Sequence, residues 1–187
     1  MNIFYLHPDT RLCAQQHCDK HVVKMIIEYA QLMSTAHRVL DGTMYQAKTK
    51  LNRNIKRWRM VDAELENTLY KASHINHPSG KWCRMTKENY GYLYSLWLEL
   101  CKEYTHRYGR KHLTQEKLEH ILVKTPDNIP SAGVTTLPQA MPDDVKMADP
   151  LDGYRKYYRT YKRDFAKWTN RQTPEWFNVS DKQTNKS

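Results

Sequence analysis

The fold is decided by the stretch HCDKHVVKMIIEYAQLMSTAHRVLDG at residues 17–42. Its apolar side chains recur at steps of three and four residues, which is the period of one buried face of an α-helix. These apolar positions are Val22, Ile26, Tyr29, Met33, Ala36 and Leu40. Upstream, Asp9 or Thr10 can cap the start of a helix, and Asp41-Gly42 is a typical stop signal. The pattern therefore predicts one long helix over residues 10–41.

Polar side chains follow the same spacing on the opposite side of this predicted helix. They are His17, His21, Lys24, Glu28, Gln31 and Thr35. Imidazole, ammonium and carboxylate groups are what general acid–base chemistry uses, so His21, Lys24 and Glu28 are candidate catalytic residues. The competing interpretation is a solvated helix face, on which Lys24 and Glu28 form an i,i+4 ion pair worth about 0.3 kcal/mol.

A metal site on this face is a further alternative. His17 and His21, one helical turn apart, can converge on one ion, and His74 and His77 could supply more ligands. Two ligands on a helix do not complete a site, and the spacing of the other two histidines matches no zinc pattern. We therefore expect neither a metal nor another cofactor.

Further helices joined by irregular segments are predicted along the rest of the chain. Amphipathic spacing indicates helices over about residues 58–73, 86–108, 114–124 and 151–169. The basic, acid-free composition of residues 43–57 is typical of a loop. Residues 125–150 hold five of the eight prolines and should form an extended connection over the helices.

The two ends of the chain complete the predicted organisation. The opening Ile3-Phe4-Tyr5-Leu6 is too short to distinguish a strand from a buried extended arm. The last residues, 178–187, are polar and are expected to be a disordered tail. We therefore predict a mainly α fold, a single compact helical domain of residues 1–177 with a long Pro-rich loop.

The composition points to a polyanionic partner. The chain has 187 residues, with 30 Lys and Arg against 20 Asp and Glu, which gives a net charge of +10 at pH 7. A positive surface potential favours nucleic acids or other phosphate-rich ligands in a salt-dependent way. The four cysteines lack disulfide-framework or zinc-ribbon spacing, and no apolar run approaches the ~18 residues that span a bilayer. Because the start lacks signal-peptide features, we expect a cytoplasmic protein with no membrane partner.

Candidate phosphate-binding residues gather in two places. The first is the predicted loop-to-helix junction around residue 77, where cations, an imidazole and an indole lie together. The second is the predicted final helix, whose aromatic face leaves the remaining surface to basic residues. With Lys20, the candidates are His77, Lys81, Trp82, Arg84, Arg155, Lys162 and Arg163. The alternatives are that Trp82 anchors the core and that the basic side chains of the last helix cover apolar neighbours.

Four short motifs carry a likeness to a known family. They are the start MNIFYLHP, the helix that bears Glu28, the pair His77-Pro78 followed by Arg84, and the predicted helix Tyr90–Tyr108 with its basic Gly turn. Over about residues 1–110 the chain thus resembles the pyrimidine-dimer DNA glycosylase family, which includes phage endonuclease V.

The resemblance implies a compact helical DNA-repair enzyme that binds duplex DNA, flips a base out of the stack and cleaves the glycosidic bond without a metal. In that family the N-terminal α-amine attacks C1′ of the sugar and forms an imine that permits strand cleavage, with a helix glutamate assisting. Glu28 matches the place of that glutamate. α-Amines titrate at about pH 8, so a useful fraction of such groups is unprotonated at neutral pH.

The sequence departs from the family pattern in three ways. The family exposes its amine by removing the initiator Met before a small residue, whereas Asn2 is a poor context for that removal. The candidate nucleophile is therefore the α-amine of Met1 itself. The face shared by His17, His21 and Lys24 and the Pro-rich segment are also unlike the family, which points to a diverged branch whose substrate need not be a pyrimidine dimer.

Three functional hypotheses follow. The leading one is a DNA glycosylase/AP lyase that acts on damaged or modified pyrimidines, with Glu28 as the acid–base or electrostatic residue. The second is an enzyme for a small phosphorylated substrate such as a nucleotide, with His21 and Glu28 as acid and base. The third is a non-enzymatic nucleic-acid or nucleotide-binding protein. A closed pocket that joins His21 and Glu28 to Lys24, His77 and Arg84 would favour the hypothesis of a nucleotide substrate. An open basic groove would favour DNA.

Overall fold

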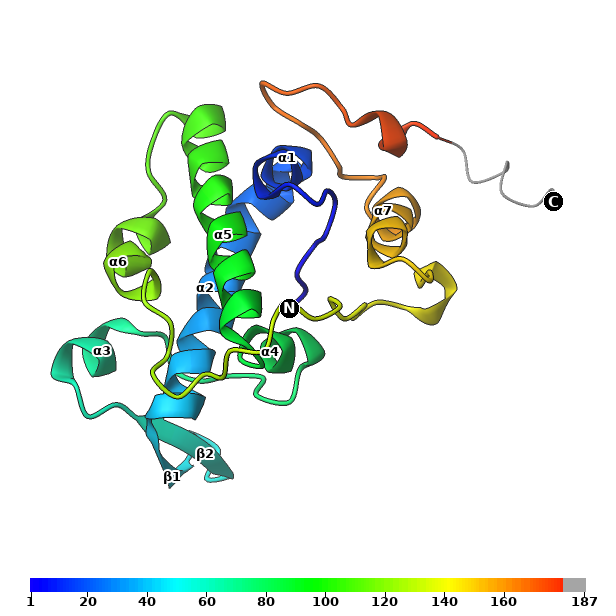
Figure 1. Ribbon diagram of the computed structural model, residues 1–187. Coiled ribbons are helices and arrows are strands. Elements are labelled where there is room, and N and C mark those ends of the chain that lie inside the picture. Colours follow the sequence, from blue (N-terminus) through cyan, green and yellow to red (C-terminus); the bar gives the residue numbers. More distant parts are fainter. Residues whose placement is uncertain (180–187) are drawn as a thin grey trace.

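The computed structural model describes residues 1–179, and these residues form a mainly α-helical structure (Figure 1). The helices are α1 (Thr10–Gln16), α2 (Asp19–Asp41), α3 (Ala63–Thr68), α4 (Pro78–Cys83), α5 (Lys87–Tyr108), α6 (Leu113–Leu122) and α7 (Pro150–Tyr161). One antiparallel hairpin pairs β1 (Thr43–Lys48) with β2 (Asn54–Arg59), and short 3-10 turns lie at Asp143–Val145 and Glu175–Phe177. The predicted mainly α fold is confirmed. Most of the predicted tail lies outside the described residues.

Helices α2 and α5 pack against each other at the centre of the molecule (Figure 1). The predicted apolar stripe of α2 is fully buried at Val22, Ile26, Tyr29, Met33 and Ala36. It meets buried side chains of α5, and the indole N–H of Trp97 donates to the carbonyl of Ile26 over 2.9 Å. Burial of a Val, Ile or Met side chain stabilises the fold by about 2 kcal/mol, and burial of the Ala36 methyl group by about 0.8 kcal/mol.

The prediction of one continuous helix over residues 10–41 is wrong, because the chain bends at His17-Cys18 and separates α1 from α2. Both residues have extended backbone angles, with ψ of 132° and 159°. The last carbonyls of α1 are satisfied by side chains from distant segments. Arg107 donates to the Gln15 carbonyl over 2.9 Å, and the Trp168 indole donates to the Gln16 carbonyl over 2.9 Å. Tertiary hydrogen bonds thus replace the helical ones that the sequence pattern predicts.

The opening segment is a buried extended arm and belongs to no sheet. Ile3, Phe4 and Leu6 are almost completely buried. Their backbone groups bind side chains: Phe4 N–H donates to the Tyr29 hydroxyl over 3.0 Å, and Arg155 donates to the Leu6 carbonyl over 3.0 Å. Cys13 donates its S–H to the Phe4 carbonyl and accepts the Leu6 N–H through its sulfur. Side chains therefore take the place of a partner strand.

Two predictions between residues 43 and 73 are wrong. Residues 43–57 were expected to be a loop but belong to the hairpin, and the helix expected over 58–73 shrinks to α3. The buried Arg38 explains the shorter helix, because its guanidinium donates to the carbonyls of Trp58, Glu66, Leu69 and Tyr70 and to the Glu66 carboxylate. Carbonyls that an α-helix would use are thereby turned towards one side chain at the C-terminal end of α2.

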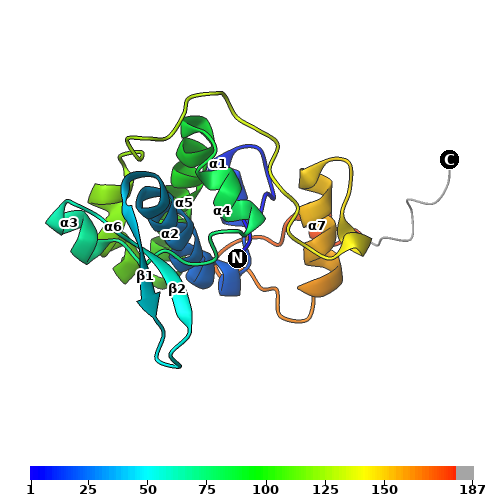
Figure 2. The ribbon, with the colours of Figure 1, turned by 90° about the horizontal axis from the view of Figure 1, so that it is seen from below.

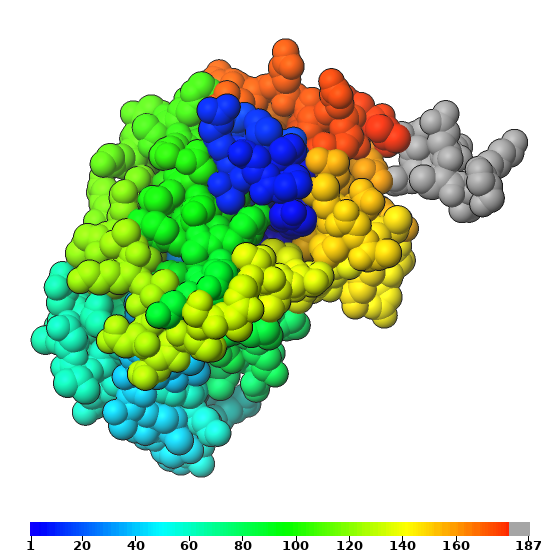
Figure 3. Space-filling view, viewed as in Figure 1, coloured from blue at the N-terminus to red at the C-terminus, as the bar shows by residue number. Residues whose placement is uncertain are grey.

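The second half of the chain follows the predictions more closely. Helix α5 begins after Thr86, whose hydroxyl accepts the Asn89 N–H over 3.0 Å, and ends at Gly109, whose φ of 69° suits glycine. Helix α6 matches its predicted range to within a few residues. The Pro-rich connection lies extended over the helices, as expected, and crosses the molecule from α6 to α7 (Figure 3). Asp41 and Glu88 hold it by accepting backbone N–H groups from residues 127–133.

Helix α7 is shorter than the predicted helix over 151–169, since it ends at Tyr161. The following residues turn back towards the start of α2, where Asp19 accepts the backbone N–H and the hydroxyl of Thr169. This turn also brings Trp168 onto the end of α1. The aromatic residues predicted to share one helical face therefore come from a helix and from the loop after it.

Arg38 should be essential for stability. Because the guanidinium is buried and satisfies four carbonyls and one carboxylate, Arg38→Met removes the donor that these carbonyls share and the charge partner of Glu66. It should lower the free energy of unfolding by about 3 kcal/mol. Urea unfolding followed by circular dichroism measures the change. The control is Lys102→Met, which removes an exposed i,i+3 ion pair on α5 and should cost under about 0.5 kcal/mol. Equal losses in the two variants would contradict this role of Arg38.

Candidate functional site

An amine–carboxylate cluster lies where the N-terminus meets α2, and it consists of Met1, Lys24 and Glu28. The Glu28 carboxylate sits between two ammonium groups. Its Oε2 lies 3.9 Å from the α-amine of Met1, and its Oε1 lies 3.2 Å from Lys24 Nζ. The side chain of Glu28 is 18% exposed and that of Lys24 is 63% exposed. The cluster is therefore open to solvent on the Lys24 side and enclosed on the Met1 side.

The buried arm fixes the position of the α-amine. Phe4 N–H binds the hydroxyl of Tyr29, the residue that follows Glu28 in α2. The same hydroxyl lies 3.0 Å from Nε2 of His17, whose Nδ1 lies 2.8 Å from the Cys13 carbonyl. A carbonyl only accepts, so His17 carries its proton on Nδ1 and its Nε2 accepts from Tyr29. Burial lowers the pKa of His17 to about 4, which keeps the ring neutral in this chain of hydrogen bonds.

His77 lies close enough to the cluster to sense its charges. Its pKa is lowered by burial and by the positive charge of the N-terminus, while the Glu28 carboxylate acts in the opposite direction. The ring is held at the start of α4, where Nδ1 accepts the Ser79 N–H over 3.2 Å. Arg84 supports the preceding turn by donating to the Ile75 carbonyl over 2.6 Å. Burial and the charge of the N-terminus therefore both favour the neutral form of this imidazole.

The predicted polar face of α2 is wrong for three of its members, because His17, His21 and Thr35 are buried in the core. His21 stacks on Phe4 and hydrogen-bonds the hydroxyl of Tyr158. Burial lowers the pKa of His21 to about 2, and nearby positive charges add to the effect. This histidine is therefore a neutral packing residue in the structure. Lys24 and Glu28 alone bring candidate acid–base groups of α2 to the surface cluster.

Several predicted phosphate contacts lie over aromatic rings around α7. Lys20 and Lys162 both place their ammonium groups over the Phe165 ring, at 4.6 and 5.9 Å from its centre. Arg155 lies over Trp176 and donates to the arm, and Arg163 lies over Phe177. These contacts are worth about 0.5–1 kcal/mol each at exposed sites. The basic residues of this region therefore cover aromatic neighbours, and part of their charge still faces solvent.

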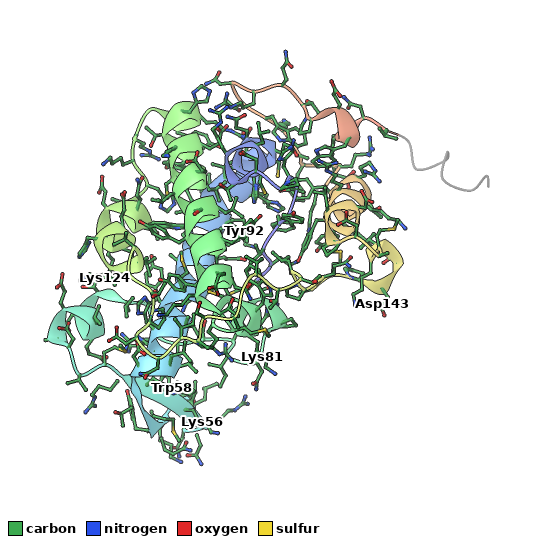
Figure 4. All side chains as sticks on the ribbon, in the orientation of Figure 1. Lys56, Trp58, Lys81, Tyr92, Lys124 and Asp143 are labelled. Atoms are coloured by element: carbon green, nitrogen blue, oxygen red, sulfur yellow. The ribbon has the colours of Figure 1, made fainter. Side chains whose placement is uncertain are left out.

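Trp82 is a core residue that also forms one wall of a cleft. It is 3% exposed, and its indole N–H donates to the Thr135 carbonyl over 3.1 Å. The cleft has a volume of about 390 Å³ and includes Tyr5, Tyr92 and Leu137 in its lining. Lys81 is exposed on α4, below Tyr92 in Figure 4. The predicted junction thus separates into an exposed cation and a buried indole.

Within residues 1–179, no group of three or more His, Cys, Asp and Glu side chains is arranged to hold a metal ion. All four cysteines are free and buried, and burial raises the pKa of Cys13 to about 11 and that of Cys83 to about 12. No helix among these residues has the length and apolar character needed to cross a membrane.

The comparisons with known proteins leave the site to be interpreted from its own geometry. The chain matches no protein-family model, no curated protein and no solved structure.

The two core histidines should make stability fall in mild acid. Folding holds the pKa of His17 at about 4 and that of His21 at about 2, whereas each unfolded imidazole binds a proton near pH 6.5. The unfolded chain thus takes up protons that the folded chain does not bind. The contribution of the two neutral rings to the free energy of unfolding is fully present above about pH 7. It declines as the pH falls below 6.5, by about 1.4 kcal/mol per pH unit for each histidine.

The variant His17→Gln should remove one of these contributions. The slope of the unfolding free energy between pH 6 and pH 5 should decrease by about 1.4 kcal/mol per pH unit, whatever the absolute loss of stability. Urea unfolding at several pH values measures the slope. The matched control is His120→Gln on the exposed side of α6, which replaces a solvent-facing histidine in the same way. An unchanged slope in His17→Gln would contradict the neutral state of the buried ring.

Proposed function

We propose that this protein is a metal-independent DNA glycosylase/AP lyase whose nucleophile is the α-amine of Met1 and whose assisting carboxylate is Glu28. One observation carries the proposal: the amine lies 3.9 Å from the carboxylate, although the two groups are distant in sequence. This is the pairing that the family resemblance implies. The net charge of +10 adds a general affinity for a polyanionic substrate.

The groups of the cluster suit an amine–imine mechanism. The unprotonated amine attacks C1′ of a flipped nucleotide, the bond from C1′ to the base breaks, and the base leaves with the electron pair of that bond and takes up a proton. Glu28 accepts the proton that the attacking nitrogen loses. The nitrogen then forms a second bond to C1′ as the C1′–O4′ bond breaks, and O4′ keeps the electron pair and takes up a proton, which gives the protonated imine. Loss of a proton from C2′ forms the C2′–C3′ double bond, and the 3′ phosphate leaves with the electron pair of the C3′–O bond.

The surroundings of the amine suit the first step. The arm is held by hydrogen bonds of Phe4 and Leu6, so the amine needs little ordering before it reacts. His77, whose pKa is lowered by burial and by the charge of the N-terminus, is a candidate to accept a proton during the elimination. The ammonium of Lys24 keeps a positive charge beside the place where a phosphate would lie.

A small phosphorylated substrate is supported less well. That hypothesis used His21 as a catalytic acid or base, and the ring of His21 is buried against Phe4 and Tyr158. The open side of the cluster at Lys24 is flanked by Val23 and Ile27, which are 40% and 46% exposed. An open surface with exposed apolar residues beside a reactive pair is better suited to a large substrate than to a small nucleotide.

Borohydride trapping tests the mechanism. Incubation with duplex DNA that contains an abasic site, or a cyclobutane pyrimidine dimer, should give a covalent protein–DNA adduct after reduction. Peptide mapping by mass spectrometry should place the adduct on the α-amine of Met1, and the mass of the intact protein should show that Met1 is retained. An adduct on Lys24 would assign the nucleophile to that neighbouring amine, and absence of any adduct would exclude the imine mechanism.

Two variants separate the roles of the amine and the carboxylate. Glu28→Gln should slow adduct formation by about 100-fold or more while DNA binding is kept, because it removes the proton acceptor and the negative charge beside the amine but keeps the size of the side chain. Adding Gly-Ser before Met1 should abolish the adduct, since two residues displace the amine by up to about 7 Å. The matched control, Glu99→Gln on α5, should trap at the unmodified rate. Normal trapping by Glu28→Gln would refute the assigned role of Glu28.

A further inference from the structure

The hairpin of β1 and β2 has a charge pattern that sets it apart from the rest of the surface. Its cations are Lys48, Lys50, Arg53, Lys56, Arg57 and Arg59, and residues 43–59 contain no Asp or Glu. None of these six cations forms an ion pair with another described residue within 4.0 Å, although Arg57 donates to the Ala72 carbonyl and Arg59 lies over Tyr45. The hairpin therefore presents uncompensated positive charge.

The geometry of the hairpin places this charge on both of its faces. The cross-strand pairs put Lys48 and Lys56 on one face and Arg57 and Arg59 on the other. The turn is closed by Thr49, whose N–H donates to the Arg53 carbonyl over 2.9 Å. Both strands are edges, and their like charges oppose pairing with a second copy of the chain. An isolated two-stranded hairpin is only marginally stable in water, so a partner would stabilise it.

Duplex DNA fits this pattern of shape and charge. Two strands about 4.8 Å apart form a ribbon that enters the major groove, which is about 12 Å wide. The phosphates of a groove line its two walls, and cations on both faces of the ribbon can reach either wall. Six paired residues at about 3.3 Å each give a ribbon about 20 Å long, enough to reach across the groove.

The hairpin also lies at a useful distance from the amine–carboxylate cluster. Asp41, the last residue of α2, lies 13 positions after Glu28 and is separated from the hairpin only by Gly42, so about 20 Å of helix joins the cluster to the hairpin. That length equals about six base pairs of B-DNA. Figures 1 and 2 both place the N-terminus between the hairpin and α7, and Figure 2 shows the hairpin projecting from the body. Lys56 and Trp58 of the hairpin and Lys81 of α4 lie towards the same end of the molecule (Figure 4).

We propose that the hairpin is a DNA-binding element that lies in a groove of duplex DNA about six base pairs from the reacting nucleotide. The position relative to that nucleotide rests on the proposed glycosylase function. The affinity of the hairpin for duplex DNA rests on its own charge and shape. Arg38 holds the base of the hairpin by donating to the Trp58 carbonyl, so the hairpin projects in a fixed direction.

Salt-dependent binding of undamaged duplex DNA tests the role of the hairpin without requiring the glycosylase reaction. The triple variant Lys48→Gln, Arg53→Gln and Lys56→Gln should lower the steepness of log affinity against log salt by about 2 to 3, and should weaken binding about 10- to 100-fold at 0.15 M salt. The matched control is Arg110→Gln, Lys111→Gln and Lys124→Gln, which removes the same charge from exposed positions near α6. Circular dichroism should show that both triple variants fold normally.

Equal losses in the two triple variants would overturn the proposal, because net charge alone would then explain the binding. An unchanged salt dependence in the hairpin variant, or a defect confined to RNA or to an acidic protein, would overturn it as well. The outcome does not depend on trapping, so it stays informative if wild-type protein forms no imine.

Abasic duplexes with flanks of different length test where the hairpin binds relative to the lesion. With about 12 base pairs on both sides of the lesion, the hairpin variant should trap DNA less efficiently than the control variant. When one flank is cut to three base pairs, the wild-type protein should lose this advantage and trap at the rate of the hairpin variant. Insensitivity to the length of either flank would contradict the position, whereas failure of wild-type trapping on every duplex would refute the glycosylase function instead.

Discussion

The buried arm at residues 3–6 is the constraint on which the rest of the structure depends. A backbone group that is buried without a hydrogen bond costs about 1–3 kcal/mol, and the arm has no partner strand to prevent this. Tyr29, Cys13 and Arg155 supply the missing partners from three helices. His17, which lies at the bend between α1 and α2, must then stay neutral in order to accept the hydrogen bond from Tyr29. The distance between the α-amine and Glu28 is a result of the same arrangement.

Much of the positive charge that the sequence displays is used inside the protein. Arg107 is buried with Glu103 and Asp19, and Arg171 completes this network from the segment after α7. Arg38 serves the carbonyls around α3 in a similar way. A buried guanidinium can satisfy several acceptors at once, which suits the ends of short helices. The charge left for a partner is therefore concentrated on the hairpin, on the exposed face of α2 and near α7.

The sequence predicted those elements whose local signals agree with their tertiary partners. The apolar stripe of α2, the caps of α5 at Thr86 and Gly109, and the extended Pro-rich connection depend on neighbours in the chain. The bend at His17, the short α3 and the hairpin depend on hydrogen bonds to residues far away, such as Arg107 and Arg38, and no local pattern reports these. Within the cluster, helical spacing predicted Lys24 and Glu28, and the resemblance predicted Met1 and again Glu28. The same spacing misplaced His21, because it cannot show which polar side chain is covered by α7.

The hydrogen bond from Arg155 to the Leu6 carbonyl joins residues that are 149 positions apart in the chain. During synthesis at about 5–20 residues per second, the first of these groups would wait on the order of 10 s for the second. In that interval the arm lacks the hydrogen bond from Arg155, and apolar side chains such as Ile3 and Phe4 have no complete core in which to pack. The arm therefore reaches its final set of hydrogen bonds only after α7 has been synthesised.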